Sequence, residues 1–126
     1  MTQPTGQPAI RTVAMPADTN ANGDIFGGWL LAQMDLAGGL VAIRRAQGRV
    51  ATIAVESMKF IRPVAVGDEV SLYATIREIG RTSIHIFIEA WGRHRDETEM
   101  NKVTEAIFVF VALGEDRRPR PVPPET

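Results

Sequence analysis

The feature that most constrains the fold is an abrupt switch from a polar run to a long apolar one. Residues 18–24 are rich in Asp, Asn and Gly, and Asn22-Gly23 is a strong turn signal. Residues 26–47 then have the pattern of a single helix that is apolar on nearly every side. Such a helix is expected to be buried on most of its sides, so the rest of the chain must wrap around it.

The segments that could wrap it have the period-two pattern of strands. A short strand is predicted at residues 10–15, before Pro16, and apolar and polar residues alternate along 69–77 and 84–91. Residues 50–58 and 103–113 are apolar-rich, and the latter segment suits a central strand. One long central helix wrapped by a curled antiparallel sheet is an α+β fold. Because so small a sheet leaves a helix side or a strand edge uncovered, a homo-oligomer is expected.

Details of the helix point to close contacts. Gly38 and Gly39 each cost about 1 kcal/mol relative to Ala in mid-helix, which suggests that a strand or another copy packs very closely there. Arg44 and Arg45 lie near the C-terminal end, where cations are favourable, and Gly48 is the predicted cap.

The 126 residues predict one domain at 10–113, between a flexible N-terminal tail, 1–9, and a Pro/Arg-rich flexible tail, 114–126. A net charge of −1 argues against a nucleic-acid partner. No apolar run is long and uninterrupted enough for a membrane span, and no signal core precedes the domain. The absence of cysteine excludes disulfides, thiolate metal sites and cysteine nucleophiles, so a cytoplasmic protein is the default expectation.

The start of the helix is the candidate site for chemistry. A helix N-terminus offers unpaired N–H groups and a positive dipole end, and Asp24 would place a base beside it. The alternative is that Asp24 only caps the helix. Asp35 lies about 16 Å further along the axis, too far to form a carboxylate pair with Asp24, and is interpreted as a polar contact between subunits.

Other chemical signals favour structural roles. Residues 18–24 match half of a calcium loop, but Trp29 occupies the position of the required bidentate Glu. Glu56 is interpreted as a structural carboxylate, and His85 and His94 as surface or interface histidines without a metal partner. No metal site is therefore predicted.

Four segments together resemble the hotdog-fold acyl-CoA thioesterases, and most closely their bacterial YciA-type branch. They are DIFGGW at 24–29, VESMKFIRPVAVGD at 55–68, GRTSI at 80–84 and TEA at 104–106, and the resemblance covers about residues 10–113. It implies the hotdog fold, dimers that join their sheets, trimers of dimers, and active sites at the dimer interface.

The resemblance also implies hydrolysis of acyl-CoA to free acid and CoA, with CoA as part of substrate and product and no separate cofactor. Asp24 would be the general base, or less favourably a nucleophile, and the amides of Gly27 and Gly28 would stabilise the oxyanion. Asn20 would position the water or the opposite chain's loop. The residues expected to bind substrate are Phe60, Arg62, Pro63, Arg81, Thr82 and Ser83. The alternative function is a non-catalytic acyl-CoA-binding regulatory module on the same fold. A hotdog dehydratase is discounted, because no histidine lies in or next to the helix.

Overall fold

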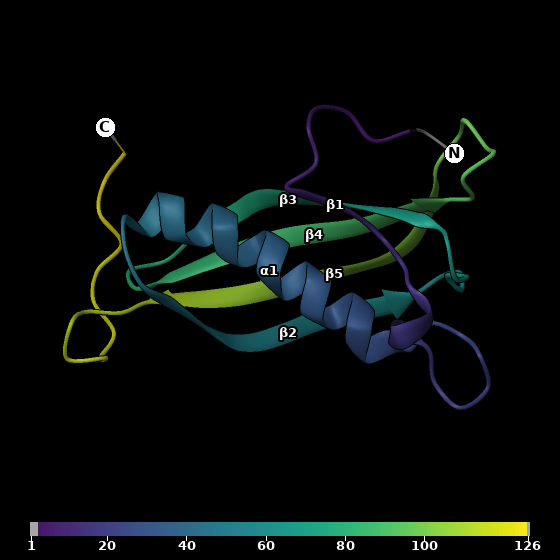
Figure 1. The fold of residues 1–126 in the computed structure, drawn as a ribbon. Helices are drawn as coiled ribbons and strands as arrows, with labels where there is room; N and C mark the ends of the chain where they lie inside the picture. Colours follow the sequence, from purple (N-terminus) through teal and green to yellow (C-terminus); the bar gives the residue numbers. More distant parts are fainter. Residues whose placement is uncertain (1–2, 126) are drawn as a thin grey trace.

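The computed structural model describes residues 3–125, which form one long helix and a five-stranded antiparallel sheet (Figure 1). In chain order the elements are β1 (Ile10–Val13), a short 3₁₀ turn (Pro16–Asp18), α1 (Gly27–Ala46), β2 (Val50–Phe60), β3 (Glu69–Ile79), β4 (Ser83–Arg93) and β5 (Asn101–Ala112). The predicted α+β fold is confirmed. Residues 1, 2 and 126 of the predicted tails lie outside the described part.

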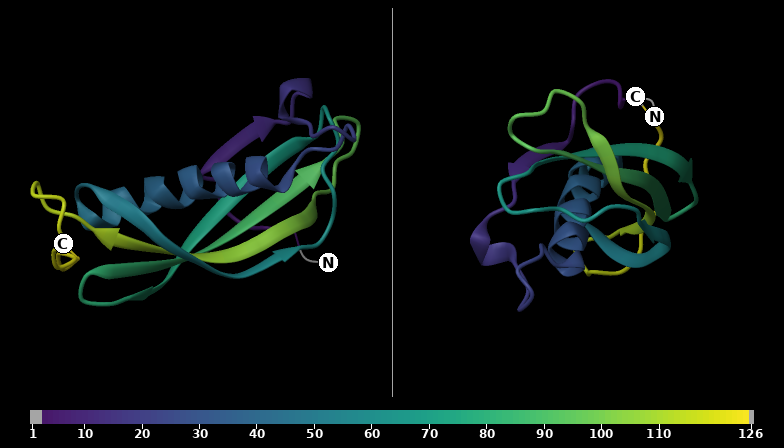
Figure 2. Two further views of the ribbon diagram at one scale, coloured as in Figure 1. Left: turned by 90° about the horizontal axis from the view of Figure 1, so that it is seen from below. Right: turned by 90° about the vertical axis from the view of Figure 1, so that its right-hand side faces the viewer.

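The sheet has the strand order β1-β3-β4-β5-β2, so β1 and β2 form its two edges. The sheet curls around α1, which lies along its concave face (Figure 2). All four neighbouring pairs are antiparallel. The helix start therefore lies at the same end of the molecule as the end of β2 and the start of β5, and the helix end lies beside the β3–β4 hairpin.

The core forms between α1 and the strands behind it. On the helix, Leu30, Met34 and Ala37 are buried, and on the sheet the fully buried residues include Ile88 and Phe110. The alternating burial of β4 confirms its predicted period, because one face of an antiparallel strand packs on the core.

The prediction that α1 is buried on most of its sides is wrong for the single chain. Its outer face exposes Leu36, Leu40 and Ile43 by 58%, 44% and 47%. The physical reason is that one curled sheet covers only one side of a helix. On β2, Ile53 and Val55 are also exposed, by 60% and 41%.

The two mid-helix glycines differ in their surroundings. A Cβ on Gly38 would lie 2.5 Å from Ile88 Cδ1 and 3.0 Å from the Phe110 ring, so the predicted close approach of the sheet is present there. A Cβ on Gly39 would meet nothing within 4 Å in the described chain. Gly38 therefore lets the helix pack closely against the sheet, whereas Gly39 lies on the outer face of the helix.

The end of α1 differs by one position from the prediction. The left-handed residue is Gln47, with φ of 55°, rather than Gly48, whose φ of 159° is close to extended. A Cβ on Gly48 would lie 2.8 Å from Nη2 of Arg120, so glycine lets this guanidinium keep its place at the helix end without shifting. That guanidinium donates to the carbonyls of Ala46 and Leu113 and so pins the C-terminal segment to the helix end.

Further contacts hold the segment after β5. Val122 donates its backbone N–H to the carbonyl of Arg81, and Arg45 donates to the carbonyl of Pro123. Residues 114–125 therefore run along the end of the molecule that contains the β3–β4 hairpin. The flexibility of the two tails and the domain boundaries remain predictions.

Candidate active site

The loop that leads into α1 is shaped by its own polar groups. Oδ1 of Asn20 accepts hydrogen bonds from the backbone amides of Asn22 and Asp24 at 2.9 and 3.2 Å. The amide of Asn20 in turn donates to the carbonyl of Asp24 at 2.7 Å. Asn20, predicted to position a water, therefore holds the backbone that carries Asp24.

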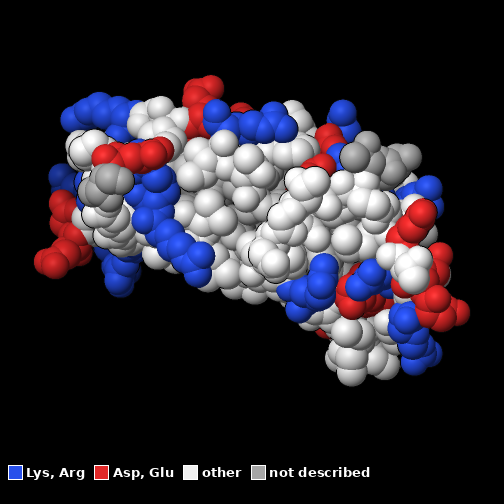
Figure 3. All heavy atoms as spheres, turned by 90° about the horizontal axis from the view of Figure 1, so that it is seen from above, with Lys and Arg blue, Asp and Glu red and all other residues white. Residues whose placement is uncertain are grey.

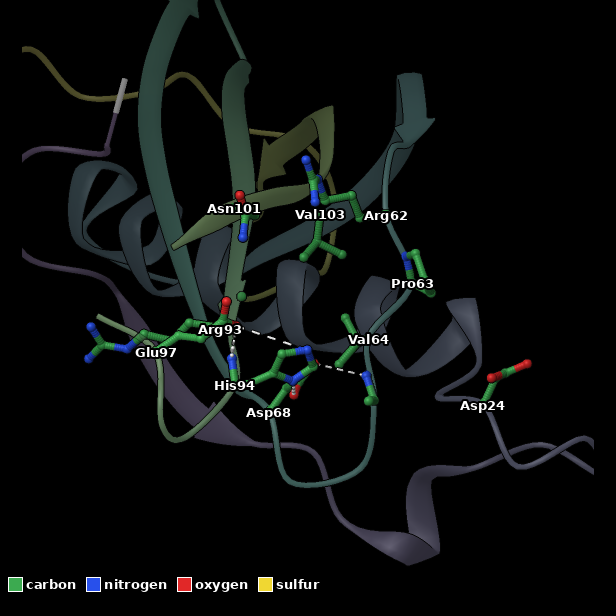
Figure 4. A pocket seen from close by; sticks show the side chains of 12 residues that line it. Asp24, Arg62, Pro63, Val64, Asp68, Arg93, His94, Glu97, Asn101 and Val103 are labelled. Carbon is green, nitrogen blue, oxygen red and sulfur yellow. Dashed lines mark hydrogen bonds and ion pairs between the residues drawn. The ribbon is translucent and has the colours of Figure 1, made fainter. Parts of the chain in front are cut away.

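Asp24 does not cap the helix. The residue at the N-cap is Phe26, which has no side-chain capping bond, and Asp24 is exposed two positions before it. The structure thus removes the main structural explanation for this aspartate. Its carboxylate stands at the rim of a cavity, apart from the other labelled side chains and turned away from them (Figure 4).

That cavity, of about 320 Å³, lies between the loop after β2 and the start of β5. The residues that line it are Asp24, Arg62, Pro63, Val64, Ala65, Asp68, Gly92, Arg93, His94, Glu97, Asn101 and Val103. Its wall carries three acidic side chains, two arginines and His94 between apolar residues, so the cavity does not present charge of a single sign.

A second hollow, of about 290 Å³, opens directly at the helix start, where Gly27, Phe60, Arg62 and Pro63 are among its lining residues. The Phe60 ring lies 3.1 Å from where a Cβ on Gly27 would be, so glycine lets this ring pack against the helix start without shifting. The amides of Gly27 and Gly28 belong to the first helical turn and have no intrahelical acceptor. The fold therefore brings Asp24, the two glycines and the segment 60–63 to one end of the molecule.

The other predicted substrate residues lie elsewhere. Arg81, Thr82 and Ser83 form the β3–β4 hairpin at the opposite end of the sheet, beside the end of α1. A helix of 20 residues is about 30 Å long. Within one chain, these residues are thus not brought together with Asp24.

Sequence reasoning missed a second carboxylate site on the exposed face of α1. Asp35 accepts a hydrogen bond from the hydroxyl of Thr52 at 2.5 Å. The two residues line a groove of about 320 Å³ whose other walls are Leu36, Gly39, Leu40, Ile43, Val50 and Phe110. Thr52 lies where the register between β2 and β5 shifts, and no pattern in the sequence predicted this shift.

His94 occupies a less ordinary position than the predicted surface or interface histidine. Its Nδ1 lies 2.5 Å from Oδ1 of Asp68, a carboxylate whose side chain is only 10% exposed. That hydrogen bond and the negative charge of Asp68 raise the pKa of His94 above its usual 6.5. Asp68 belongs to the segment 55–68 that carried the resemblance, but its pairing with His94 required the tertiary structure.

No group of three or more side chains suited to hold a metal ion occurs among residues 3–125. Within the same residues, no helix is long and apolar enough to cross a membrane. On the face in Figure 3, acidic and basic side chains interleave at both ends of the molecule, with no extended basic patch.

Comparison with known proteins agrees with this geometry. Residues 22–99 match the model of the thioesterase superfamily. The acyl-CoA thioester hydrolase YciA of Salmonella typhimurium is 53% identical over 123 residues, covering 95% of this chain and 92% of the relative.

Two solved structures extend the likeness to three dimensions. An aspartate-to-alanine variant of a hexameric broad-specificity acyl-coenzyme A thioesterase has a TM-score of 0.91 and 47% identity, covering 97% of this chain and 90% of that one. The acyl-CoA hydrolase of Staphylococcus aureus, solved with butyryl-CoA, CoA and CoA disulfide, has a TM-score of 0.84 and 25% identity, covering 90% and 70%. The chain therefore belongs to the thioesterase superfamily, has the hotdog fold, and is closely related to the YciA acyl-CoA thioester hydrolases.

Proposed function

We propose that this chain hydrolyses acyl-CoA thioesters to the free acid and CoA, with water as the only co-reactant and no cofactor. The observation that carries the proposal is the identity of 53% to an acyl-CoA thioester hydrolase over nearly the whole chain. The hollow at the start of α1 supports it, because Gly27 lines the hollow and a thioester carbonyl bound beside the first helical turn could accept hydrogen bonds from the unpaired amides there.

In this proposal Asp24 is the general base that removes a proton from the attacking water. Its carboxylate is not used for capping, which leaves its oxygens available. Phe60, Arg62 and Pro63 would contact the pantetheine arm, and Arg62 would meet a phosphate. Since a single exposed carboxylate is a poor base, the proposal also requires a second copy to enclose this entrance.

Asp35 is a rival base that the structure itself raises. The Thr52 hydroxyl orients one of its oxygens, and the surrounding groove is mostly apolar. An acyl chain would suit such a groove, and burial by a second copy would strengthen the carboxylate as a base, because desolvation disfavours its charged form. Whether Asp24 or Asp35 is the base, we propose that Asn20 acts by holding the loop before α1 in shape, through the hydrogen bonds that its Oδ1 accepts.

We also propose a homo-oligomer of dimers, such as a trimer of dimers. The exposed β2 edge and the apolar outer face of α1 support it, because both are costly to leave in water. A second copy is also the only source from which Arg81, Thr82 and Ser83 could reach an Asp24 site. Nucleic-acid and membrane partners are not proposed, and a cytoplasmic location remains a sequence-based prediction.

The test is release of CoA from a panel of acyl-CoAs of increasing chain length, followed with a thiol-reactive dye. The chain contains no cysteine, so the protein adds no thiol background. We expect release that is proportional to protein concentration, for at least one chain length.

The contrary result is binding of acyl-CoA, measured by calorimetry, without release at any chain length. That result would contradict the enzymatic function and favour the alternative, a non-catalytic acyl-CoA-binding regulatory module. Calorimetry on the same preparation is the control that separates this outcome from an inactive, misfolded sample.

A further inference from the structure

Two tight turns face each other across the wall of the cavity near Asp24. In the turn 65–68, the amide of Ala65 donates to Oδ2 of Asp68 at 2.9 Å, and the amide of Asp68 donates to the carbonyl of Ala65 at 3.1 Å. In the turn 94–97, the amide of His94 donates to Oε1 of Glu97 at 3.0 Å, and the amide of Glu97 donates back to the carbonyl of His94 at 2.9 Å. Each turn is thus closed by its own side chain.

The His94–Asp68 hydrogen bond joins these two turns, which are 26 residues apart in sequence. Oδ1 of Asp68 faces the imidazole while Oδ2 is engaged by its own turn. The two sides differ in exposure, since the Asp68 side chain is 10% exposed and the His94 side chain 59%. A carboxylate held in this way cannot turn to solvent when its partner leaves, so its charge favours a positive partner.

We propose that His94 and Asp68 form a proton-dependent latch, which holds the turn 94–97 against the turn 65–68 and thereby fixes the cavity wall beside Asp24. When the imidazole is protonated, Nδ1–H donates to Asp68 and the two opposite charges attract. When it is neutral, the attraction is lost and the tautomer without a proton on Nδ1 cannot donate. The latch rests on this geometry alone and does not depend on the proposed catalytic activity.

The surroundings of His94 are mixed in charge, but its nearest partner is acidic. Glu97 Oε1 lies 4.0 Å from its Nε2, and Asp96 adds a weaker negative charge from the same loop. The basic groups that share the cavity or the adjoining surface hollow are Arg62, Arg93 and Arg95, and Asp24 lies at the far rim. Arg93 is neutralised by Glu69 at 2.9 Å, so it does not compete with His94 for Asp68.

The sign of the pH dependence follows from the raised pKa of His94, which the hydrogen bond that His94 donates to Asp68 chiefly causes. The latch stabilises the fold fully below the pKa of an unfolded histidine, and its contribution is lost as the pH rises through the folded pKa. His94→Gln should therefore lower stability relative to wild type at about pH 5.5, and the difference should vanish by about pH 8.5.

The direct experiment is an NMR titration of the full chain, which has two histidines. His94→Gln assigns the imidazole signals by removing one of them. The control variant is Asp68→Asn, whose amide oxygen can still accept from the Ala65 amide while the charge is lost. We expect the His94 midpoint to fall in Asp68→Asn. In wild type, the Ala65 amide signal should follow the same midpoint as the imidazole.

Denaturant unfolding at the two pH values supplies a second readout. In the Asp68→Asn background, His94→Gln should no longer change stability in a pH-dependent way. An unchanged His94 midpoint in Asp68→Asn, or a pH-dependent effect of His94→Gln that persists in that background, overturns the latch. Neither readout involves thioester turnover, so failure of the latch and failure of the proposed function are distinguishable.

Discussion

The start of α1 and its outer face each present an aspartate, in opposite surroundings. Asp24 is exposed at the rim of a cavity whose wall carries acidic and basic side chains, on a loop held by Asn20, and its carboxylate has no capping role. Asp35 lies in a mostly apolar groove, and the Thr52 hydroxyl fixes one of its oxygens. One site offers unpaired helix amides, whereas the other offers an oriented carboxylate and space for an acyl chain.

This difference separates two alternative bases, because within one chain only Asp24 lies near the amides at the helix start. The amides of Gly27 and Gly28 lie about 10–12 Å along the helix axis from Asp35, at 1.5 Å per residue. Both regions adjoin surfaces that a homo-oligomer would cover. A second copy is therefore what would turn either half-site into an enclosed one.

Neutralising each aspartate separately tests which of the two, Asp24 or Asp35, is the general base. Asp24→Asn should lower the rate of CoA release by about 100-fold or more, as expected for loss of a general base, with Asp35→Asn as the matched control. CoA release and circular dichroism of both variants provide the measurement. If the Asp24→Asn variant is folded and has a near-normal rate while the Asp35→Asn variant is inactive, Asp35 rather than Asp24 is the general base.

A charge on the outer face of α1 should break the assembly. Leu40→Glu places a carboxylate in the exposed apolar surface, which a second copy could bury only at a high desolvation cost. We expect a shift to a smaller species in light scattering after gel filtration. Val66→Glu, at a residue of similar exposure in the loop after β2, is the control and should leave the mass unchanged. An unchanged mass for Leu40→Glu would exclude this face as the interface.

The two glycines of α1 sharpen the contrast between its inner and outer faces. Gly38→Ala should lower the free energy of unfolding by about 1–3 kcal/mol, because its Cβ would crowd Ile88 and Phe110. Gly39→Ala adds the same methyl group where no atom lies within 4 Å, so it should raise the free energy of unfolding by up to about 1 kcal/mol, because alanine favours the helix. Denaturant unfolding compares them, and equal losses would contradict the assignment of faces.

The smallest expected effect concerns the hydroxyl that orients Asp35. Thr52→Val keeps the side-chain shape but removes the hydrogen bond, which should cost about 1 kcal/mol of stability. If Asp35 only serves as a polar contact between subunits, the rate of CoA release per folded protein stays close to wild type. A rate loss that matches that of Asp35→Asn would instead show that the pair acts in catalysis.

Much of the fold was predictable, because it depends on local patterns. The apolar run after Asn22-Gly23 predicted α1, and the period-two segments predicted the strands that cover it. The crowding of Gly38 also followed from the cost of a mid-helix glycine. The prediction that this chain buries α1 on most sides was wrong. Apolar composition shows that a helix face must be covered, but it does not show whether the same chain or a second chain covers it.

The candidate site was predictable only in part. The sequence alone determined that Asp24, Gly27 and Gly28 meet at a helix start, since neighbours in sequence share a turn. Only the tertiary structure brought Phe60 onto Gly27, separated Arg81 from Asp24 by most of the length of the molecule, and paired Asp35 with Thr52 and His94 with Asp68. The physical reason is that these contacts depend on strand register, bulges and loop closure, which are set by packing between distant segments rather than by any local pattern.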